Sequence, residues 1–405
     1  MRSSRAWLLV AALLLNPLAA SANVITDWDE KAVALIQPRM TPPVAYRAMA
    51  IVYLAMFEAV NSIEPRYRAY KSKLPATPAI SKEAAAATAA GVALSKLVPD
   101  LAVDIKAAMT NYLAALPDGT DKADGIKLGT EAAEAIVAAR ANDGSAAADS
   151  YRPVTTAGVY VPTSVMVAPQ WPNLTPFAMT SATQFRPEPP IALDSEQWAR
   201  DYNEIRELGS KTSSKRTARQ TEDARFWLLT GPLATHPLQC QIAIARHMSV
   251  VDSARFMATI AVAEADAMIV LMDAKYKYAF WRPVTAIRNG DIDGNAATER
   301  DAAWQPIDNT PMHPEYPCAH CLVSSTVAAA IEAMLGTADV GEISMVSPMA
   351  PAATHRWSNL YAYADEVAAA RIYAGFHYRF STQVGQRVGR AVGAYVVNTV
   401  LRPLN

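Results

Sequence analysis

Cysteine is scarce in this sequence, and no excess of charge of either sign is present. Three cysteines among 405 residues are too few for a disulfide framework. The formal net charge of −1 excludes a general nucleic-acid binder and restricts any anion site to a local cluster of basic groups. Segments typical of β-strands are also few. Hydrophobic residues make up 51% of the chain, which is enough for a large core, and the oligomeric state stays open.

The first 22 residues have the features of a secretory signal peptide. Met1-Arg-Ser-Ser-Arg5 is basic, an apolar run follows, and Ala20-Ser-Ala22 supplies the small residues that a signal peptidase recognises. A membrane anchor is the alternative, but the run is shorter than the roughly 20 apolar residues that a span requires. No later stretch is long and charge-free enough to span a membrane. We therefore expect a secreted or periplasmic mature protein, cut after Ala22, without stable membrane insertion.

The remainder, residues 23–405, is predicted to form a single helical domain. Residues 23–143 and 194–405 hold apolar periodic segments, whereas residues 144–193 are proline-rich and irregular and either wrap the surface or form a lid. The predicted helices span about 42–63, 81–97, 101–116, 122–141, 196–209, 217–229, 238–250, 253–280, 318–335, 357–375 and 381–400. The fold class is therefore all-α, a large helical bundle with long irregular loops.

A basic segment, Lys275-Tyr-Lys-Tyr-Ala-Phe-Trp-Arg-Pro283, closes the longest of these predicted helices. Lys275 and Arg282 are seven residues apart, which on one helix returns to nearly the same face, and Pro283 is expected to end the helix there. Taken alone, this pattern is equally typical of a solvated basic surface.

Two histidines lie beside features that favour an anion. His320 is near the start of a helix, where free backbone N–H groups attract negative charge, so it is a candidate acid–base; a capping or core histidine is the alternative. Arg371 and His377 lie on either side of an apolar helix end. An arginine in such a run needs a buried partner, either an anionic ligand or an acidic side chain. A lysine, two arginines, a helix N-terminus and two histidines together suit a tetrahedral oxyanion.

The order of these residues resembles the signature of the type 2 phosphatidic acid phosphatase and vanadium-dependent haloperoxidase superfamily. That signature is Lys-x6-Arg-Pro, then Pro-Ser-Gly-His, then Ser-Arg-x5-His-x3-Asp. The corresponding residues here are Lys275, Arg282-Pro283, Pro317-Cys318-Ala319-His320, Ala370-Arg371, His377 and Ser381. The resemblance covers residues 275–381 and implies the helical-bundle fold of the vanadium haloperoxidases and acid phosphatases.

The resemblance also implies a role for each matching residue. His377 bonds the vanadium of vanadate in a peroxidase, or is the phosphohistidine nucleophile in a phosphatase, and His320 is the general acid–base. The implied oxyanion-binding groups are Lys275, Arg282, Arg371, Cys318 and the backbone N–H of Ala319.

Three positions depart from the family pattern. Cys318 replaces a serine whose hydroxyl bonds an oxyanion oxygen, and a thiol is a weaker donor. Ala319 replaces glycine but keeps the N–H. Ser381 replaces the aspartate that orients the bonding histidine, so the Ser381 hydroxyl or another acidic residue has to substitute.

Two features favour the peroxidase branch of the superfamily. Phe280-Trp281 before Arg282 is similar to the fungal-type chloroperoxidase motif, and His313 occupies a place where peroxidases of bromide and iodide tend to have histidine. His313 and Trp281 are therefore halide-site candidates. Against this reading, Cys318 beside bound peroxide is open to oxidation.

The expected activity is the oxidation of bromide or iodide by hydrogen peroxide, with vanadate held on His377. The first alternative is an acid phosphatase without a cofactor, which hydrolyses phosphate monoesters or lipid phosphates. The second is a degenerate anion-binding relative without catalysis.

Cys318-Ala-His-Cys321 is a Cys-x-x-Cys motif, which is also found in proteins with other functions. Leu322 follows the second cysteine where covalent haem attachment requires histidine, so that function is excluded. A redox-active or structural disulfide fits an oxidising compartment. A zinc site formed by His313, Cys318, His320 and Cys321 is another alternative. Neither alternative accounts for the basic residues.

Overall fold

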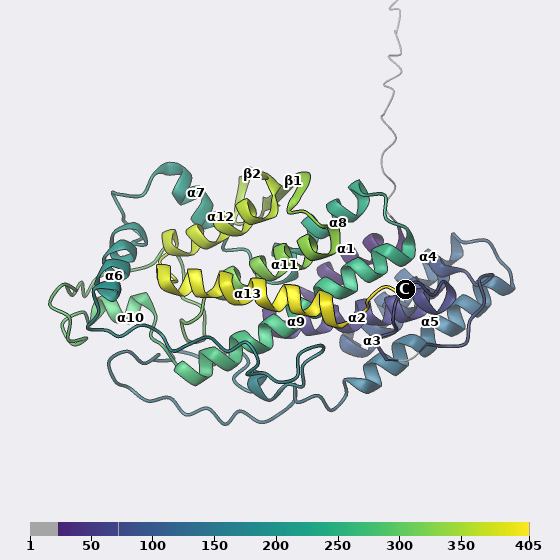
Figure 1. Cartoon of the computed structure of the whole chain (residues 1–405), viewed down its shortest axis with the longest axis horizontal. Coiled ribbons are helices and arrows are strands. Elements are labelled where there is room, and N and C mark those ends of the chain that lie inside the picture. Colours follow the sequence, from purple (N-terminus) through teal and green to yellow (C-terminus); the bar gives the residue numbers. More distant parts are fainter. Residues whose placement is uncertain (1–22, 72, 405) are drawn as a thin grey trace, which may run out of the picture.

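The computed structural model describes residues 23–71 and 73–404, and the expected signal peptide lies outside these residues. Helices dominate this part of the chain, which confirms the all-α prediction (Figure 1). The α-helices are α1 (Val24–Ile36), α2 (Pro42–Ile63), α3 (Lys82–Leu97), α4 (Ala102–Ala114), α5 (Thr120–Ala139), α6 (Glu196–Leu208), α7 (Ala218–Phe226), α8 (His236–Ala245), α9 (Val250–Tyr278), α10 (Pro283–Arg288), α11 (Ala319–Leu335), α12 (Leu360–Tyr373) and α13 (Arg379–Thr399). One antiparallel hairpin, β1 (Asp339–Ser347) and β2 (Ala350–Asn359), lies beside α12.

Helix α9 runs through the centre of the molecule. Its start is capped by Ser249, whose side chain accepts a hydrogen bond from the N–H of Asp252. It packs against α2, α11 and α13, while α3, α4 and α5 gather at one end of the molecule and α6 and α10 at the other (Figure 1). The C-terminal end of α9 brings Lys275 to the candidate site.

Helix α2 corrects one expectation about membranes. It is long and apolar enough to cross a bilayer, although no stretch after the signal peptide was expected to be. However, 89% of its most apolar window is buried inside the protein, as for a core helix.

The segment 144–193 contains no α-helix or strand, as expected, and one short 3-10 turn at Trp171–Asn173. Two acids of α9 hold it in place. Asp266 accepts hydrogen bonds from the backbone N–H groups of Phe177, Ala178 and Met179 at 2.6, 2.8 and 2.8 Å. Asp273 accepts two bonds from Arg186 at 2.6 and 2.7 Å. The segment is therefore anchored to the central helix, and whether it acts as a lid stays a prediction.

Helices α11 and α13 approach closely because α13 has glycine at every fourth position of their interface. A Cβ atom at Gly389 would lie 2.2 Å from the carbonyl oxygen of Leu322, and one at Gly393 would lie 2.4 Å from that of Thr326. Any side chain there would push the helices apart. The packing fixes the start of α11, which carries His320, against the start of α13.

Some elements differ from the prediction. Helix α1 and the hairpin were not predicted, and residues 357–359 belong to β2 rather than to a helix. Helix α9 ends at Tyr278 because Ala279 takes a left-handed conformation (φ 47°), and Pro283 starts α10 instead of ending α9. Proline is favoured at the first position of a helix. The prediction that Lys275 and Arg282 share one helix face was therefore wrong.

A buried charged group joins α1, α8 and α9. The Nδ1 atom of His236 lies 2.6 Å from Asp29 and its Nε2 lies 3.2 Å from Glu264. Tyr53 and Cys240 both donate hydrogen bonds to Asp29. Burial disfavours the charged imidazole, but the two carboxylates outweigh it and raise the pKa of His236 to about 10. His236 is therefore an imidazolium in the folded protein at neutral pH.

The first prediction concerns the pH dependence of stability. The pKa of His236 is about 10 in the folded protein and about 6.5 in an unfolded chain. Its stabilisation is therefore complete below about pH 6.5 and is lost as the pH rises through about 10. Urea denaturation should show the free energy of unfolding falling over this range. His236→Gln should lower it by about 3–5 kcal/mol at pH 7 and flatten the slope.

His247→Asn, at an exposed histidine, is the control and should leave both the stability and the slope unchanged. A slope in His236→Gln equal to that of the wild type would contradict the account.

Candidate active site

A cavity of about 300 Å³ lies where the N-terminal helices meet the C-terminal ones, and its lining is mostly apolar. Helix α2 contributes Pro42, Pro43 and Tyr46, and α9 contributes Met268 and Met272. Five of the predicted site residues also line it: His313, Ala319, His320, Arg371 and His377. No acidic side chain is among the described residues that line this cavity. The cavity therefore suits a ligand that is anionic where it meets the basic groups and apolar elsewhere.

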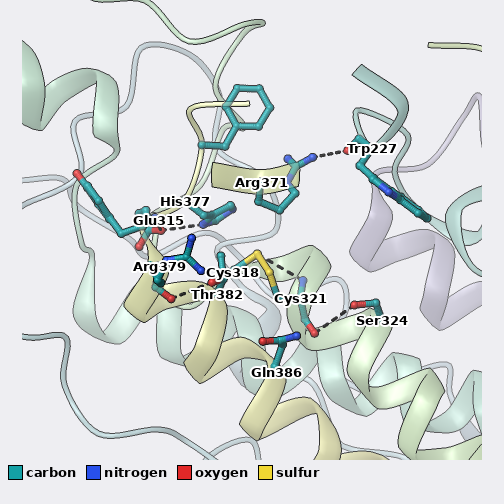
Figure 2. Close-up of a disulfide and its surroundings, with 12 residues drawn as sticks. Trp227, Glu315, Cys318, Cys321, Ser324, Arg371, His377, Arg379, Thr382 and Gln386 are labelled. Atoms are coloured by element: carbon teal, nitrogen blue, oxygen red, sulfur yellow. Dashed lines mark hydrogen bonds and ion pairs between the residues drawn. A yellow bond between two sulfur atoms is a disulfide. The ribbon is translucent and has the colours of Figure 1, made fainter. Parts of the chain in front are cut away.

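His377 lies between the acidic side chain of Glu315 and the basic side chain of Arg282. Its Nδ1 is 2.8 Å from Oε1 of Glu315, and its Nε2 is 3.2 Å from Nη1 of Arg282 (Figure 2 shows the former contact). A guanidinium can only donate, so Nε2 accepts and Nδ1 carries the proton. Burial, reinforced by Arg282 and Lys275, holds the pKa of His377 well below its usual value. The imidazole is thus neutral, with a lone pair on Nε2.

Glu315 is the site residue that the sequence analysis missed. Besides the bond from His377, its carboxylate accepts one from the backbone N–H of Tyr378 at 3.2 Å. Burial raises the pKa of Glu315 to about 7, against the opposing effects of Lys275 and Arg282. It provides the carboxylate that Ser381 lacks, and the nearby Ser381 hydroxyl interacts with this carboxylate and opposes the rise in its pKa. The only signal in the sequence is an acid within the stretch from His313 to Pro317.

Three buried basic side chains, Lys275, Arg282 and Arg371, form what we term the cation cluster. Burial, followed by repulsion from Arg282, holds the pKa of Lys275 well below its usual value. Lys275 donates to the carbonyl oxygens of Pro314 and Glu315 at 2.8 and 2.7 Å. Lys275 and Arg282 lie behind the cavity surface, whereas Arg371 lines it.

The two arginines are held by carbonyls and histidines rather than by carboxylates. Arg282 donates to the carbonyl oxygens of His313 and Phe376, each at 3.0 Å, and contacts Nδ1 of His313 at 3.0 Å. Arg371 donates to the carbonyl oxygen of Trp227 (Figure 2), and its Nε has no partner among the described residues. Burial lowers the pKa of Arg282 to about 10 and, together with repulsion from Arg282, that of Arg371 to about 9. Both stay charged at neutral pH and lack a matching anion.

A tight turn brings Arg371 and His377 to the same cavity. The backbone N–H groups of Phe376 and His377 both bond to the carbonyl oxygen of Arg371, at 3.1 and 3.4 Å. Gly375 takes a positive φ of 80°, which glycine adopts without strain. Arg371, at the end of α12, and His377 therefore face the same cavity.

His320 occupies the first turn of α11, as predicted. Its Nε2 lies 2.9 Å from the carbonyl oxygen of Leu229 and donates to it, so Nδ1 is the acceptor nitrogen. Burial, followed by Arg371, keeps the pKa of His320 well below its usual value. His320 is a neutral base, and the adjacent Ala319 N–H belongs to the first helical turn, where no intrahelical acceptor exists.

Cys318 and Cys321 form a disulfide across the start of α11 (Figure 2). The prediction that Cys318 offers a thiol donor to an oxyanion was therefore wrong, because a disulfide has no S–H group. The alternative of a zinc site with His313 and His320 fails for the same reason. Cys318 instead caps the helix, with its sulfur accepting from the N–H of Cys321 at 3.4 Å.

The two halide-site candidates lie in different surroundings. His313 lines the cavity beside Arg282. Trp281 is buried in an aromatic cluster, stacked on Trp198 with ring centroids 6.0 Å apart, and is not among the residues that line the cavity. Its position gives no support to a halide contact.

Comparisons with known proteins agree with this geometry. Residues 255–405 match the family model described as the VCPO second helical-bundle domain, and this part contains every predicted site residue. Residues 255–405 therefore carry the second helical-bundle domain of this family, in agreement with the superfamily that the motifs of the chain resemble. The comparison with curated proteins gives no match.

Solved structures show that the superfamily fold extends over nearly the whole chain. A bacterial vanadium-dependent iodoperoxidase superposes with a TM-score of 0.81 at 23% identity, covering 96% of this chain and 99% of its own. The holo-type bacterial vanadium-dependent chloroperoxidase gives 0.73 at 16% identity, covering 94% of this chain and 93% of its own. The apo-type chloroperoxidase gives 0.74 at 16%, covering 88% and 93%.

The residues present fit the oxyanion that this superfamily holds. A tetrahedral anion would neutralise the cation cluster, occupy the unpartnered Nε of Arg371 and meet the lone pair on Nε2 of His377. The disulfide removes one donor that the family pattern includes. The site therefore suits vanadate or phosphate with fewer hydroxyl contacts.

The second prediction tests Glu315 as the group that orients His377. Glu315→Gln removes the charge that keeps the proton on Nδ1, and the amide can donate to Nδ1 and shift that proton to Nε2. Affinity for orthovanadate, measured by calorimetry, should fall by about 10- to 100-fold.

Glu342→Gln, an exposed glutamate on β1, is the matched control and should bind vanadate as the wild type does. Wild-type affinity in Glu315→Gln would show that the carboxylate does not control the state of His377.

Proposed function

We propose that the protein is a vanadium-dependent haloperoxidase, which holds vanadate on Nε2 of His377 and oxidises bromide or iodide with hydrogen peroxide. One observation carries the proposal: a neutral, carboxylate-oriented His377 adjoins three buried basic side chains, against which Glu315 is the one acid among the described residues. Vanadate, when bound, supplies a Lewis acid that activates hydrogen peroxide toward attack by a halide.

Each side chain has a role in this proposal. Arg282, Arg371 and Lys275 stabilise negative charge on the oxyanion oxygens, and the N–H of Ala319 adds a donor at the start of α11. His320, whose Nδ1 is the acceptor nitrogen, takes a proton from the incoming peroxide and returns it to the departing oxygen. His313, which lines the cavity beside Arg282, is the residue that contacts the halide.

Three observations support the peroxidase over the phosphatase. The Cys318–Cys321 disulfide leaves no free thiol at Cys318, which removes the objection that peroxide would oxidise it. His313, the candidate halide contact, lines the cavity. The fold is similar to that of a bacterial vanadium-dependent iodoperoxidase along 96% of the chain.

An acid phosphatase is the second candidate, and the cavity favours it. Its largely apolar walls offer room for the organic part of a phosphate ester, which halide oxidation does not need. In that reaction the lone pair of His377 Nε2 forms a bond to phosphorus as the ester P–O bond breaks, and the leaving oxygen takes a proton from water. A second water then attacks phosphorus and breaks the N–P bond, giving its proton to Nδ1 of His320 and releasing phosphate.

We further propose a secreted or periplasmic location. The signal-like residues 1–22 and a disulfide at Cys318 both suit an oxidising compartment.

The third prediction separates these functions with a paired assay of purified protein. Bromide or iodide oxidation should appear with hydrogen peroxide and orthovanadate, and hydrolysis of p-nitrophenyl phosphate without vanadate should be weak or absent. His377→Ala should abolish the halide oxidation, because no other neutral imidazole meets Arg282 through Nε2, whereas His247→Asn should retain it.

Strong ester hydrolysis that vanadate inhibits, without halide oxidation, would overturn the proposal in favour of the phosphatase. Inactivity in both assays would favour a degenerate anion-binding protein.

A further inference from the structure

A second group of charged side chains lies outside the candidate active site, where α7, β2 and α12 meet. It consists of Glu222, Asp223, His355, Glu366 and Arg219, which we term the His355 cluster. The imidazole of His355 is buried, stacks on Phe226 with ring centroids 3.8 Å apart, and has Nδ1 2.5 Å from Oε1 of Glu366. The surroundings of the other ring nitrogen, Nε2, suggest what the cluster binds.

Nε2 of His355 faces two carboxylates without a hydrogen bond. It lies 3.4 Å from Oε1 of Glu222 and 3.9 Å from Oδ1 of Asp223, and it has no hydrogen-bond partner within residues 23–71 and 73–404. Because Glu366 accepts the proton on Nδ1, an Nε2 without a proton of its own faces two acceptors with its lone pair. Such an arrangement is repulsive unless a cation or a proton lies between them.

The spacing of these atoms fits a small metal ion. The three ligand atoms lie within 4.8 Å of one another. Ligands held at 2.0–2.1 Å around a tetrahedral zinc ion are separated by about 3.3 Å, close to the distance between His355 and Glu222. The bond from His355 to Glu366 is also the usual support of a metal-bound histidine, because it fixes the tautomer and the ring orientation.

The charge balance also favours a divalent cation. Three carboxylates face one cation, Arg219, whose Nε lies 2.8 Å from Asp223 and whose Nη1 lies 3.0 Å from Glu222. These four side chains carry a formal net charge of −2. The Arg219 side chain is 57% exposed, so it can move into solvent when a metal takes its place between the carboxylates.

We propose that Glu222, Asp223 and His355 bind a divalent transition-metal cation of the zinc type, with Glu366 orienting His355 and water completing the coordination. An imidazole ligand favours zinc-type ions over magnesium and calcium, which prefer oxygen ligands alone. The site is separate from the vanadate site and does not depend on the proposed function.

The proposed metal would stabilise the wall of the candidate active site. Trp227 directly follows α7, its Nε1 donates to Glu366 at 3.0 Å, and its carbonyl oxygen accepts from Arg371. A cation that joins α7 to β2 therefore fixes the backbone that holds Arg371. The role is structural, since no ligand of the metal lines the cavity.

The fourth prediction tests this site on the chelator-treated full chain, titrated with zinc chloride by calorimetry and thermal unfolding. The wild type should bind one equivalent and melt at a higher temperature. Glu222→Gln, at a half-exposed ligand, should lower the affinity by at least about tenfold. Arg219→Met should raise the affinity, because it removes the competing cation.

Glu342→Gln, on the same hairpin and exposed, is the matched control and should bind zinc as the wild type does. Absence of zinc binding, or equal affinity in the wild type and Glu222→Gln, would overturn the proposal. A lower melting temperature of Arg219→Met without a higher affinity for zinc would also overturn it. The cluster would then be an ion-pair network around a protonated His355. Zinc binding that His377→Ala abolishes would also overturn it, since the ion would lie in the other site.

Discussion

The burial of three basic side chains, two of them charged arginines, around one neutral imidazole is the constraint on which this structure depends. Removing a charge from water destabilises a protein by several kcal/mol unless a partner compensates it. Within the described part of the chain, Glu315 is the one acid that opposes Lys275, Arg282 and Arg371, and backbone carbonyls take the place of other acidic partners. The fold therefore holds a binding site with uncompensated positive charge, which a bound anion would neutralise. The buried basic side chains lower the stability of the anion-free protein. The same side chains increase its affinity for an anion and stabilise negative charge that develops during a reaction.

The scaffold explains how such a cluster is kept. Central helix α9 carries Lys275 into the core, and the turn at Gly375 brings the end of α12 to His377. Close packing of α11 on α13 fixes the first turn that bears His320. The buried imidazolium of His236, one residue after Thr235, which lines the cavity, ties α8 to α1 and α9. The N-terminal helices thus complete a cavity whose basic groups all come from the C-terminal half.

The order of the motifs predicted the convergence of Arg282 with Arg371 and His377, because Arg282 lies in one motif with a fixed pattern and the other two residues share a second. It could not predict Glu315, which pairs with a histidine 62 residues away, since such a contact depends on how the loops fold. The helix boundary at Pro283 was ambiguous because proline both ends and begins helices. Whether Cys318 is a thiol or a disulfide depends on its redox environment as well as on backbone geometry, and neither can be read from composition.

The most direct test of the central claim is a crystal structure of the protein grown with orthovanadate. The account predicts one tetrahedral anion at bonding distance from Nε2 of His377, with Arg282 and Arg371 as hydrogen-bond donors and Nδ1 of His377 still on Glu315. An anion bound elsewhere, or none, with Nε2 of His377 still paired to Arg282, would contradict it.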